Sequence, residues 1–263
     1  MDIGAPFKVQ SEPYTITIST KISTALHTLI ARWKLDETEG SSAADSSGNN
    51  LIGTLVGDPQ WLSSGGKFGG ALKLDGVDDY VETNYATDLP AWTVAVWVNS
   101  PAVPSSEVPS GPLHRNKNYH INWNHSFDDF RGTAGMQVAD TWYAASFGDL
   151  QANTWYHLAA TYDGEEFKSY KNGILITNNS TPSGEPDTEN TTLKLGRHSL
   201  YGDHFGGIID DARIYNYALS QADITKIFTG KKLGKGANRI LILVIVVIAA
   251  IAATLVIRVT KSK

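Results

Sequence analysis

The sequence lacks cysteine altogether, although it is 263 residues long. No disulfide framework, zinc–thiolate site or cysteine nucleophile is therefore possible. This absence does not exclude an extracellular location, because it only removes the usual sign of one. Two hydrolase motifs are missing as well, the zinc-binding H-E-x-x-H and the serine nucleophile elbow G-x-S-x-G.

Charged residues are few, and neither sign dominates. The 22 Lys and Arg residues and the 27 Asp and Glu residues leave a formal net charge of -5. Nucleic-acid-binding proteins carry a basic patch or an overall positive charge. We therefore expect no nucleic-acid partner. The chain is long enough for one large β domain with a hydrophobic core of its own.

The N-terminal region lacks a long apolar run. Residues 1–20 contain no stretch of the kind that a secretory signal needs. Residues 22–33 fit either a short amphipathic helix or a strand. Residues 1–31 are therefore interpreted as a segment of unclear structure that precedes the main domain.

One long apolar run does occur, near the C-terminus. Residues 240–257, ILILVIVVIAAIAATLVI, carry no charge and only one hydroxyl, on Thr254. A helix of this length measures about 27 Å, close to the hydrocarbon thickness of a bilayer. Basic residues lie on both sides, in residues 230–239 and 258–263. This pattern predicts a single-pass transmembrane helix that anchors the chain by its C-terminus.

The sequence leaves open on which side of the membrane the main domain lies. The basic residues are nearly balanced across the apolar run, so the positive-inside rule barely discriminates. The missing signal favours the cytosol or the interior of the compartment that made the chain. In contrast, four Asn-x-Ser/Thr tripeptides suit a domain that is exposed to glycosylation.

Most of residues 32–228 fit short β-strands joined by turns. Residues 92–98, WTVAVWV, are nearly all apolar or β-branched, which is typical of a strand buried on both faces. Asp163-Gly164 and Asn172-Gly173 separate three further strand-like runs, and both pairs favour tight hairpin turns. Turn signals about every ten residues predict an all-β fold, a two-sheet antiparallel sandwich.

Residues 206–224, GGIIDDARIYNYALSQADI, predict a strand followed by a helix. Asp210 alternates with Ala212 and Ile214 in the strand, so we expect it to be buried on their face. Ser220 stands three residues before Asp223, an arrangement typical of a capping box at the start of a helix.

Six motifs follow one another along the chain: WKLDETEGSSAADSSGNNLIGTL, FGGALKLDGVDDYV, WTVAVWV, TWYHLAATYDGEEFKSYKNG, LKLGR and FGGIIDDARIYNYALSQADI. In this order they resemble the laminin-G-like jellyroll domains of the concanavalin A-like lectin/glucanase superfamily. The resemblance covers residues 33–227. It implies two curved antiparallel sheets packed face to face in a jellyroll. It also implies a binding module for glycans or proteins, often with a structural calcium ion.

These observations divide the chain into five parts. They are the N-terminal segment at 1–31, the jellyroll domain at 32–229, a basic linker at 230–239, the transmembrane helix at 240–257 and a basic tail at 258–263.

Two aspartates are the predicted metal ligands, and calcium is the predicted ion. Asp210 is expected to be buried, and the resemblance aligns it with the acidic residue typical of the family's last strand. Asp36, on the first strand, can lie beside it, since the terminal strands are neighbours in many jellyrolls. Calcium binds six to eight oxygen ligands. The alternative is that Asp210 pairs with an arginine or with backbone amides.

Four residues are the predicted ligand contacts: His198, Tyr201, Trp123 and Tyr143. Sugar binding needs a flat aromatic face with hydrogen-bonding groups beside it. His198 and Tyr201 lie in a Gly-rich stretch before the last strand, where we expect a loop rim. The alternative for Trp123 is that it lies on the packed face of a strand.

No catalytic residue is predicted. Glucanases of this superfamily carry an E-x-D-x-(x)-E motif in one strand, and the sequence has no match to it. The sequence therefore predicts a membrane-anchored, non-catalytic module that binds a carbohydrate or glycoconjugate. The first alternative is an interaction or envelope protein that binds a surface protein and no sugar. A glycoside hydrolase is the third possibility.

Overall fold

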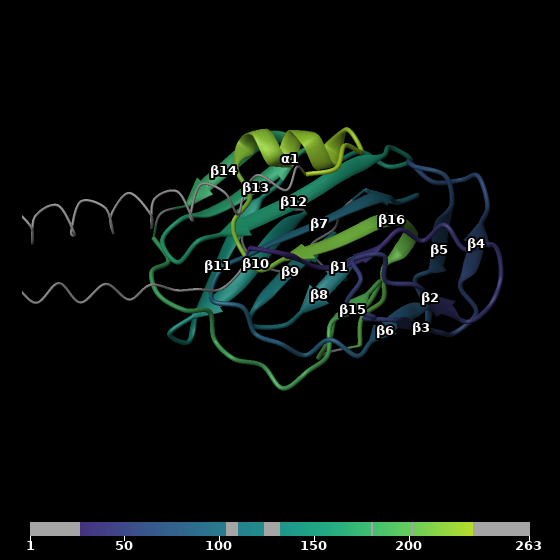
Figure 1. Ribbon diagram of the computed structural model, residues 1–263, viewed down its shortest axis with the longest axis horizontal. Coiled ribbons are helices and arrows are strands. Elements are labelled where there is room, and N and C mark those ends of the chain that lie inside the picture. Colours follow the sequence, from purple (N-terminus) through teal and green to yellow (C-terminus); the bar gives the residue numbers. More distant parts are fainter. Residues whose placement is uncertain (1–26, 104–109, 124–131, 180, 201, 234–263) are drawn as a thin grey trace, which may run out of the picture.

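The computed structural model describes residues 27–103, 110–123, 132–179, 181–200 and 202–233. These residues form two antiparallel β-sheets packed face to face, with one α-helix on the outside (Figure 1). The predicted all-β sandwich is thereby confirmed. The predicted membrane span at 240–257, most of the segment 1–31 and Tyr201 lie outside the described residues.

Sheet A contains eight strands: β1 (Leu29–Trp33), β4 (Gln60–Leu62), β5 (Ala71–Asp75), β7 (Trp92–Asn99), β12 (Tyr156–Tyr162), β13 (Phe167–Lys171), β14 (Ile174–Asn179) and β16 (Gly206–Tyr215). Their order is β14-β13-β12-β7-β16-β5-β4, and β1 pairs with β16. The first and last strands of the domain are therefore neighbours, as expected. The pairing also shows that the end of the ambiguous stretch 22–33 is a strand.

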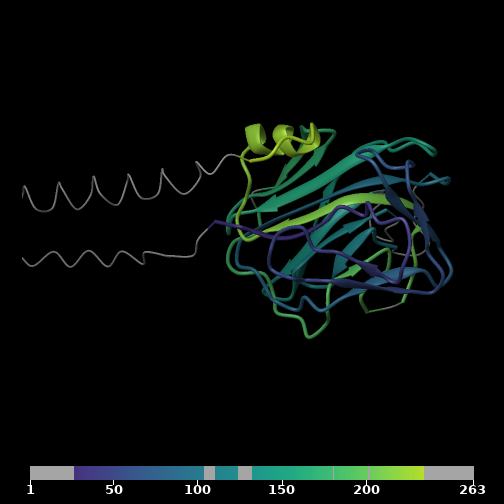
Figure 2. The ribbon, with the colours of Figure 1, turned by 45° about the vertical axis from the view of Figure 1, so that its right-hand side comes forward.

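Sheet B also contains eight strands: β2 (Ser42–Ala43), β3 (Gly53–Val56), β6 (Tyr80–Thr83), β8 (Leu113–Arg115), β9 (Tyr119–Asn122), β10 (Thr133–Val138), β11 (Thr141–Ser146) and β15 (Lys194–Leu195). Their order is β11-β10-β9-β8-β15-β6-β3-β2. The rotated view in Figure 2 shows the two sheets as separate layers, with the helix on the side of sheet A that faces away from sheet B.

The core lies between the two sheets and contains much of the aromatic content of the chain. Seven of the eight residues of β7 are buried, which confirms the prediction of a strand buried on both faces. The ring of Trp92 in β7 contacts Tyr119 of sheet B and both Tyr162 and Phe167 of sheet A, at centroid distances of 5.7, 6.2 and 5.8 Å. These ring contacts join the layers.

Strands β12, β13 and β14 form the predicted antiparallel meander. Asn172 and Gly173 connect the last two strands with φ angles of 52° and 79°. Asn and Gly adopt positive φ at the lowest cost, which is why this pair favours a tight hairpin.

Helix α1 (Gln221–Phe228) covers part of the outer face of sheet A (Figure 1). The Oγ atom of Ser220 accepts a hydrogen bond from the amide of Asp223 at 3.2 Å, so the predicted N-cap is confirmed. Ile224 and Ile227 are buried against the sheet. Among the residues that the structure describes, no helix has the length and apolar character needed to cross a bilayer.

Strand β16 contains a β-bulge that the alternation of its residues did not predict. Its register with β7 shifts between Asp210 and Arg213, and Asp211 has a φ of 48°. A bulge inserts an extra residue into a strand and thereby changes which face the following side chains occupy.

The bulge places Asp210 on the outer face of sheet A. Ala212 and Ile214 belong to the core between the sheets, whereas Asp210 pairs across the strands with Trp97. Trp97 lies between two core residues of β7 and therefore points outward. The prediction that Asp210 shares a face with Ala212 and Ile214 is wrong, because it assumed an unbroken alternation.

Candidate ligand-binding face

The outer face of sheet B carries polar side chains that strand pairing places side by side. Glu82 of β6 pairs with Lys194 of β15, and Lys194 pairs with His114 of β8. His114 in turn pairs with His120 of β9. Directly paired residues on neighbouring strands lie on the same face. These four residues are here called the polar row. Neighbours along the strands, such as Leu113, face the core, so the row faces outward.

Three histidine rings pack together in the middle of this face. The ring of His114 lies 4.6 Å from that of His120 and 3.8 Å from that of His198, measured between centroids. The Oγ atom of Ser199 lies 3.0 Å from His114 Nδ1 and accepts a hydrogen bond from the amide of Asn116 at 3.0 Å. The loop that contains His198 and Ser199 is thus held against the sheet.

Gly135 of β10 leaves room for the ring of His120. The two residues pair across β9 and β10. A Cβ atom on Gly135 would overlap the Nε2 and Cε1 atoms of His120. A glycine within a strand often marks such a close approach. The position of the histidine ring therefore depends on this glycine.

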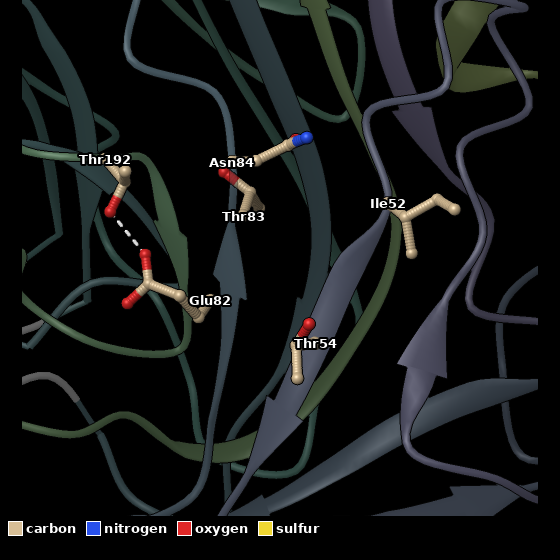
Figure 3. A pocket seen from close by; sticks show the side chains of 6 residues that line it. All are labelled: Ile52, Thr54, Glu82, Thr83, Asn84 and Thr192. Carbon is tan, nitrogen blue, oxygen red and sulfur yellow. Dashed lines mark hydrogen bonds between the residues drawn. The ribbon is translucent and has the colours of Figure 1, made fainter.

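An open groove lies at the β6 end of the polar row, lined by Ile52, Thr54, Glu82, Thr83, Asn84 and Thr192 (Figure 3). The hydroxyl of Thr192 donates a hydrogen bond to the carboxylate of Glu82. Lys194 Nζ lies 2.9 Å from the other carboxylate oxygen of Glu82. The groove thus combines hydroxyl, amide and carboxylate groups with one exposed apolar side chain, Ile52.

An exposed aromatic ring lies at the other end, on the edge strand β11. Trp142 is 48% exposed, and its ring centroid lies 5.9 Å from that of His120. It pairs across the strands with Gln137 of β10. Trp142 therefore offers a flat apolar surface beside hydrogen-bonding groups, the combination that sugar binding needs.

Three buried oxygen atoms in β9 and β10 have no hydrogen-bond partner: Asn122 Oδ1, Thr133 Oγ1 and Gln137 Oε1. Asn122 and Thr133 pair with each other across the two strands. Buried polar atoms nearly always have a partner in the protein, in ordered water or in a ligand. Of the three, Gln137 Oε1 belongs to the residue that pairs with Trp142, whereas the pair of Asn122 and Thr133 lies four positions away along β10.

The structure places the predicted ligand contacts in different surroundings. Trp123 is 2% exposed, packs edge-on against Phe205 and donates from Nε1 to the carbonyl of Ala102 at 3.2 Å. It has no ring face open to a sugar, in agreement with the alternative that it packs inside the sandwich. Tyr143 is half-buried and packs against the core.

His198 lies on the predicted loop, but it is buried against His114 and does not form an exposed rim. Tyr201 is outside the described residues. Sequence reasoning missed His114, His120 and Trp142. The signal was present, because consecutive residues in a strand point to opposite faces. If Tyr119 and Tyr143 face the core, their neighbours His120 and Trp142 must face outward.

Asp210 and Asp36, the predicted metal ligands, both hold the loop at 65–70. Asp210 Oδ2 accepts hydrogen bonds from the amides of Lys67 and Phe68 at 2.7 and 2.9 Å. Asp36 Oδ1 accepts one from the amide of Gly70 at 3.0 Å. Asp210 thus pairs with backbone amides through Oδ2, which is the contact that the alternative expected. Asp36 follows β1 in a loop and is not on the strand as expected, because Leu35 has a φ of 59°.

The second carboxylate oxygen of Asp210 meets one requirement of a cation ligand. Asp210 Oδ1 is buried and has no hydrogen-bond partner. Burial, with the charges of Asp211 and Asp36, raises the pKa of Asp210 to about 7. A nearby cation would stabilise the charged carboxylate and lower this pKa. Two carboxylates are far fewer than the six to eight oxygens that calcium takes, so backbone carbonyls or water would have to complete the set.

Asp211, next in the sequence, has ion-pair partners that Asp210 lacks. Arg32 Nε lies 2.7 Å from Asp211 Oδ1, and the guanidinium of Arg213 contacts both carboxylate oxygens. Burial opposes ionisation, but Arg213 and Arg32 hold the pKa of Asp211 below its usual value. These contacts give Asp211 a structural role in joining β1 to β16.

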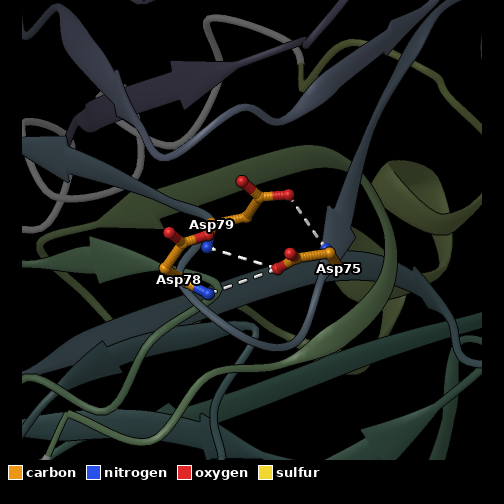
Figure 4. Close-up of side chains that lie close together, drawn as sticks. All are labelled: Asp75, Asp78 and Asp79. Carbon is orange, nitrogen blue, oxygen red and sulfur yellow. Dashed lines mark hydrogen bonds between the residues drawn. The ribbon is translucent and has the colours of Figure 1, made fainter.

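A separate acidic cluster, formed by Asp75, Asp78 and Asp79, lies in the turn between β5 and β6 (Figure 4). Asp75 Oδ1 accepts hydrogen bonds from the amides of Val77 and Asp78 at 2.8 and 3.3 Å. Asp79 Oδ2 accepts one from the amide of Asp75 at 3.0 Å. These bonds, which close the turn, account for the cluster without a ligand.

The polar row lacks the paired carboxylates of a glycosidase. Glu82 is the one carboxylate within the strands described for sheet B, and Lys194 neutralises it. A retaining glycosidase needs two carboxyl groups about 5 Å apart, and an inverting one needs two about 6.5–9.5 Å apart. Such a pair does not occur within the described strands of sheet B.

Comparison with known proteins agrees with this fold. The family model described as "Concanavalin A-like lectin/glucanases superfamily" matches residues 75–225. Domain 4 of AbnA, a GH43 extracellular arabinanase from Geobacillus stearothermophilus, was solved in complex with arabinotriose. It is 23% identical, with a TM-score of 0.62, and the match covers 76% of this chain and 98% of that one. No curated protein matches the chain in sequence.

Two toxin domains have the same fold over part of their length. The binding domain of Paraclostridial Mosquitocidal Protein 1 is 16% identical, with a TM-score of 0.58, and the match covers 76% of this chain and 52% of that one. The receptor binding domain of the botulinum neurotoxin C/D mosaic serotype is 17% identical, with a TM-score of 0.55, over 77% of this chain and 51% of that one. The chain thus spans about half the length of each toxin domain.

Proposed function

Since the chain belongs to the concanavalin A-like lectin/glucanases superfamily, we propose that it is a non-catalytic module that binds a carbohydrate or glycoconjugate. The ligand lies on the outer face of sheet B, against Trp142 and His120. One observation carries this assignment: an indole that is 48% exposed pairs across the strands with Gln137, whose buried Oε1 atom has no hydrogen-bond partner. A sugar ring can stack on the indole while one of its hydroxyls donates to the side chain of Gln137.

The similar structures support a binding role. One of them holds arabinotriose, and the others are named as binding or receptor-binding domains of toxins. Because the toxin domains are named as binding or receptor-binding domains, the alternative of a surface-protein ligand is tested as well. Identities of 16 to 23% support the shared fold, and the choice of ligand depends on the residues of this chain.

The proposed module is anchored in a membrane by residues 240–257. The support is the apolar run itself and the basic residues on both sides of it. Protease protection of the intact chain in membranes would decide on which side the sandwich lies, and therefore which ligands it meets.

Calcium is a subordinate part of the proposal. Asp210 and Asp36 would contribute carboxylate oxygens beside the loop at 65–70, where Asp210 Oδ1 is buried without a partner. The ion would stabilise this loop on sheet A, away from the sugar-binding face. Calcium should therefore raise the unfolding temperature of the chain and leave sugar affinity almost unchanged.

The test is a binding titration of the full chain in nanodiscs against an oligosaccharide panel that includes arabinotriose. We expect binding to at least one oligosaccharide and a loss of about two- to tenfold in affinity for Trp142→Ala, since a stacked aromatic group contributes about 0.5–1.5 kcal/mol beyond the area that it buries. Val77→Ala, at another exposed apolar residue, is the matched control and should bind normally.

Two outcomes would contradict the sugar-binding proposal. The first is an absence of binding to every glycan while a protein partner is retained specifically, which supports the interaction-protein alternative. The second is normal glycan binding by Trp142→Ala, which places the site elsewhere on the domain. Release of reducing sugar from a polysaccharide panel would contradict the non-catalytic assignment.

A further inference from the structure

Among the described residues, large apolar side chains are exposed at consecutive positions in one place, at the start of β14. Ile174, Leu175 and Ile176, the first residues of β14, are 66%, 41% and 39% exposed. They are here called the β14 apolar edge. The other exposed large apolar residues stand singly in the sequence: Ile52, Val77, Val103, Trp142 and Leu200. Single exposed apolar residues are normal. Leu175 pairs with Tyr170 and Ile174 pairs with Lys171, so their side chains point to opposite faces of the sheet and the run places apolar groups on both sides of this edge.

The β14 apolar edge is attached to helix α1. β14 is the last strand of sheet A, and the hairpin turn at Gly173 leads into it. The carbonyl of Gly173 accepts hydrogen bonds from Gln221 Nε2 and Thr225 Oγ1 of the helix. The ring of Phe228 also lies against this turn, 3.1 Å from the position that a Cβ atom of Gly173 would take.

The chain leaves the domain close to the same helix. Leu233, the last described residue, packs against the cluster that contains Ile224 and Ile227 of α1. The apolar run begins seven residues later, a distance that extended chain spans in at most about 25 Å. Lys231 and Lys232 are exposed between the helix and this segment. Basic residues next to a membrane span attract anionic lipid headgroups.

We propose that the β14 apolar edge rests on the lipid surface that holds residues 240–257. The edge lies lengthwise on the lipid, so that the apolar side chains on both of its sides enter the boundary between headgroups and acyl chains. We favour a bilayer over a protein partner because the short basic linker holds the membrane close to this side of the domain. The inference rests on the proposed membrane anchoring and does not depend on the sugar ligand.

The lack of cysteine permits a direct test with single labelled residues. The full chain, with Ile174→Cys carrying an environment-sensitive fluorophore, is reconstituted in vesicles of zwitterionic and anionic phospholipids. Val77→Cys is the matched control, since Val77 is 72% exposed in the β5–β6 turn. In the order of sheet A, β5 lies five strand spacings from β14, about 24 Å.

We expect nitroxide-labelled lipids to quench the label at residue 174 at least about twofold more than the label at 77, since an interfacial side chain lies about 5–10 Å deep. Ile176→Cys should behave like Ile174→Cys, which keeps the test valid if one variant folds poorly. Replacing both isoleucines by serine, with the label on Leu175→Cys, should remove the extra quenching.

Three results would overturn the inference, and they are distinguishable. Equal quenching at 174 and 77 in a chain that stays in the vesicles rejects the lipid contact while membrane anchoring stands. A blue-shifted label at 174 without lipid quenching shows that protein covers the edge, either a second copy or residues 240–257. A chain that carbonate washing removes from the vesicles rejects the anchoring itself.

Discussion

Both outer faces carry buried polar atoms without a hydrogen-bond partner, which on sheet A are Trp97 Nε1, His157 Nδ1 and Asp210 Oδ1, but the two faces differ in what lies beside these atoms. On sheet A, α1 covers Ala95, Ala159 and Tyr170, and the charges of Asp211 and Arg213 neutralise each other. On the outer face of sheet B, His120 and Gln137 lie beside the exposed indole of Trp142, and the buried side-chain oxygens of Asn122, Thr133 and Gln137 have no partner. The exposed indole of Trp142 is therefore the feature that favours the outer face of sheet B as the candidate ligand site.

The largest effect should come from breaking the ion pairs on sheet A. Asp211→Asn leaves the guanidinium of Arg213, 5% exposed, without its anionic partner. Removing one member of a buried pair costs about 3–5 kcal/mol of unfolding free energy. Urea denaturation of the full chain measures this loss. The control is Lys168→Met, which breaks the more exposed pair with Glu166 and should cost about 1 kcal/mol or less. Equal losses in the two variants would contradict this view of sheet A.

A smaller loss of stability should follow from crowding sheet B. Gly135→Ala places a methyl group where the ring of His120 lies, and overpacking of this kind costs about 1–3 kcal/mol. Gly206→Ala on sheet A is the matched control, because its Cβ would be at least 3.4 Å from any neighbour. It should unfold like the unmodified chain. If Gly135→Ala is equally neutral, the ring of His120 does not need the space above this glycine.

The two adjacent aspartates should give opposite dependences of stability on pH. The folded pKa of Asp210, about 7, lies above its ordinary value of 3.8, so its contribution is complete below pH 3.8 and is lost as the pH rises through 7. Asp211 has a lowered pKa, so its contribution is present above pH 3.8 and is lost as the pH falls through the folded pKa. Comparing the pH dependence of stability for the two aspartates thus tests whether Arg32 and Arg213 lower the pKa of Asp211.

Asp210→Asn should remove the loss of stability that occurs as the pH rises through 7. Urea denaturation between pH 4 and 7 should show a slope that is less negative by up to about 1.4 kcal/mol per pH unit than in the unmodified chain. Asp36→Asn keeps the titrating carboxyl of Asp210 and should retain a negative slope, over a range that ends at a lower pH because the charge of Asp36 no longer raises the pKa of Asp210. Identical pH profiles for Asp210→Asn and the unmodified chain would show that Asp210 ionises normally in the fold.

The sequence was sufficient to predict the sandwich, the meander and the helix cap. Each depends on local signals, such as Asn172-Gly173 or the spacing of Ser220 and Asp223, and the structure confirms them. The face occupied by Asp210 was not predictable from alternation, because one residue with positive φ shifts the register. Such a bulge depends on pairing with β1 and β7, which are distant in the sequence.

The candidate site was predicted less well than the fold. His114 and His198 meet although 84 positions separate them, and Lys194 joins the row only because β15 lies between β6 and β8. These contacts arise from strand order and not from spacing along the chain. Within single strands the sequence was informative: the choice between Trp142 and Tyr143 depended only on which of two neighbours faces the core.

The smallest effect on stability should come from the residue with the largest expected effect on binding. Trp142 lies on an edge strand and is 48% exposed, so Trp142→Ala should change the unfolding free energy by about 0.5 kcal/mol or less. Asp211→Asn should do the reverse, with a large loss of stability and normal sugar affinity in the molecules that remain folded. Calorimetric titration alongside urea denaturation measures both quantities. If stability and affinity fall together in Trp142→Ala, the indole supports the fold, and the outer face of sheet B is structural like that of sheet A.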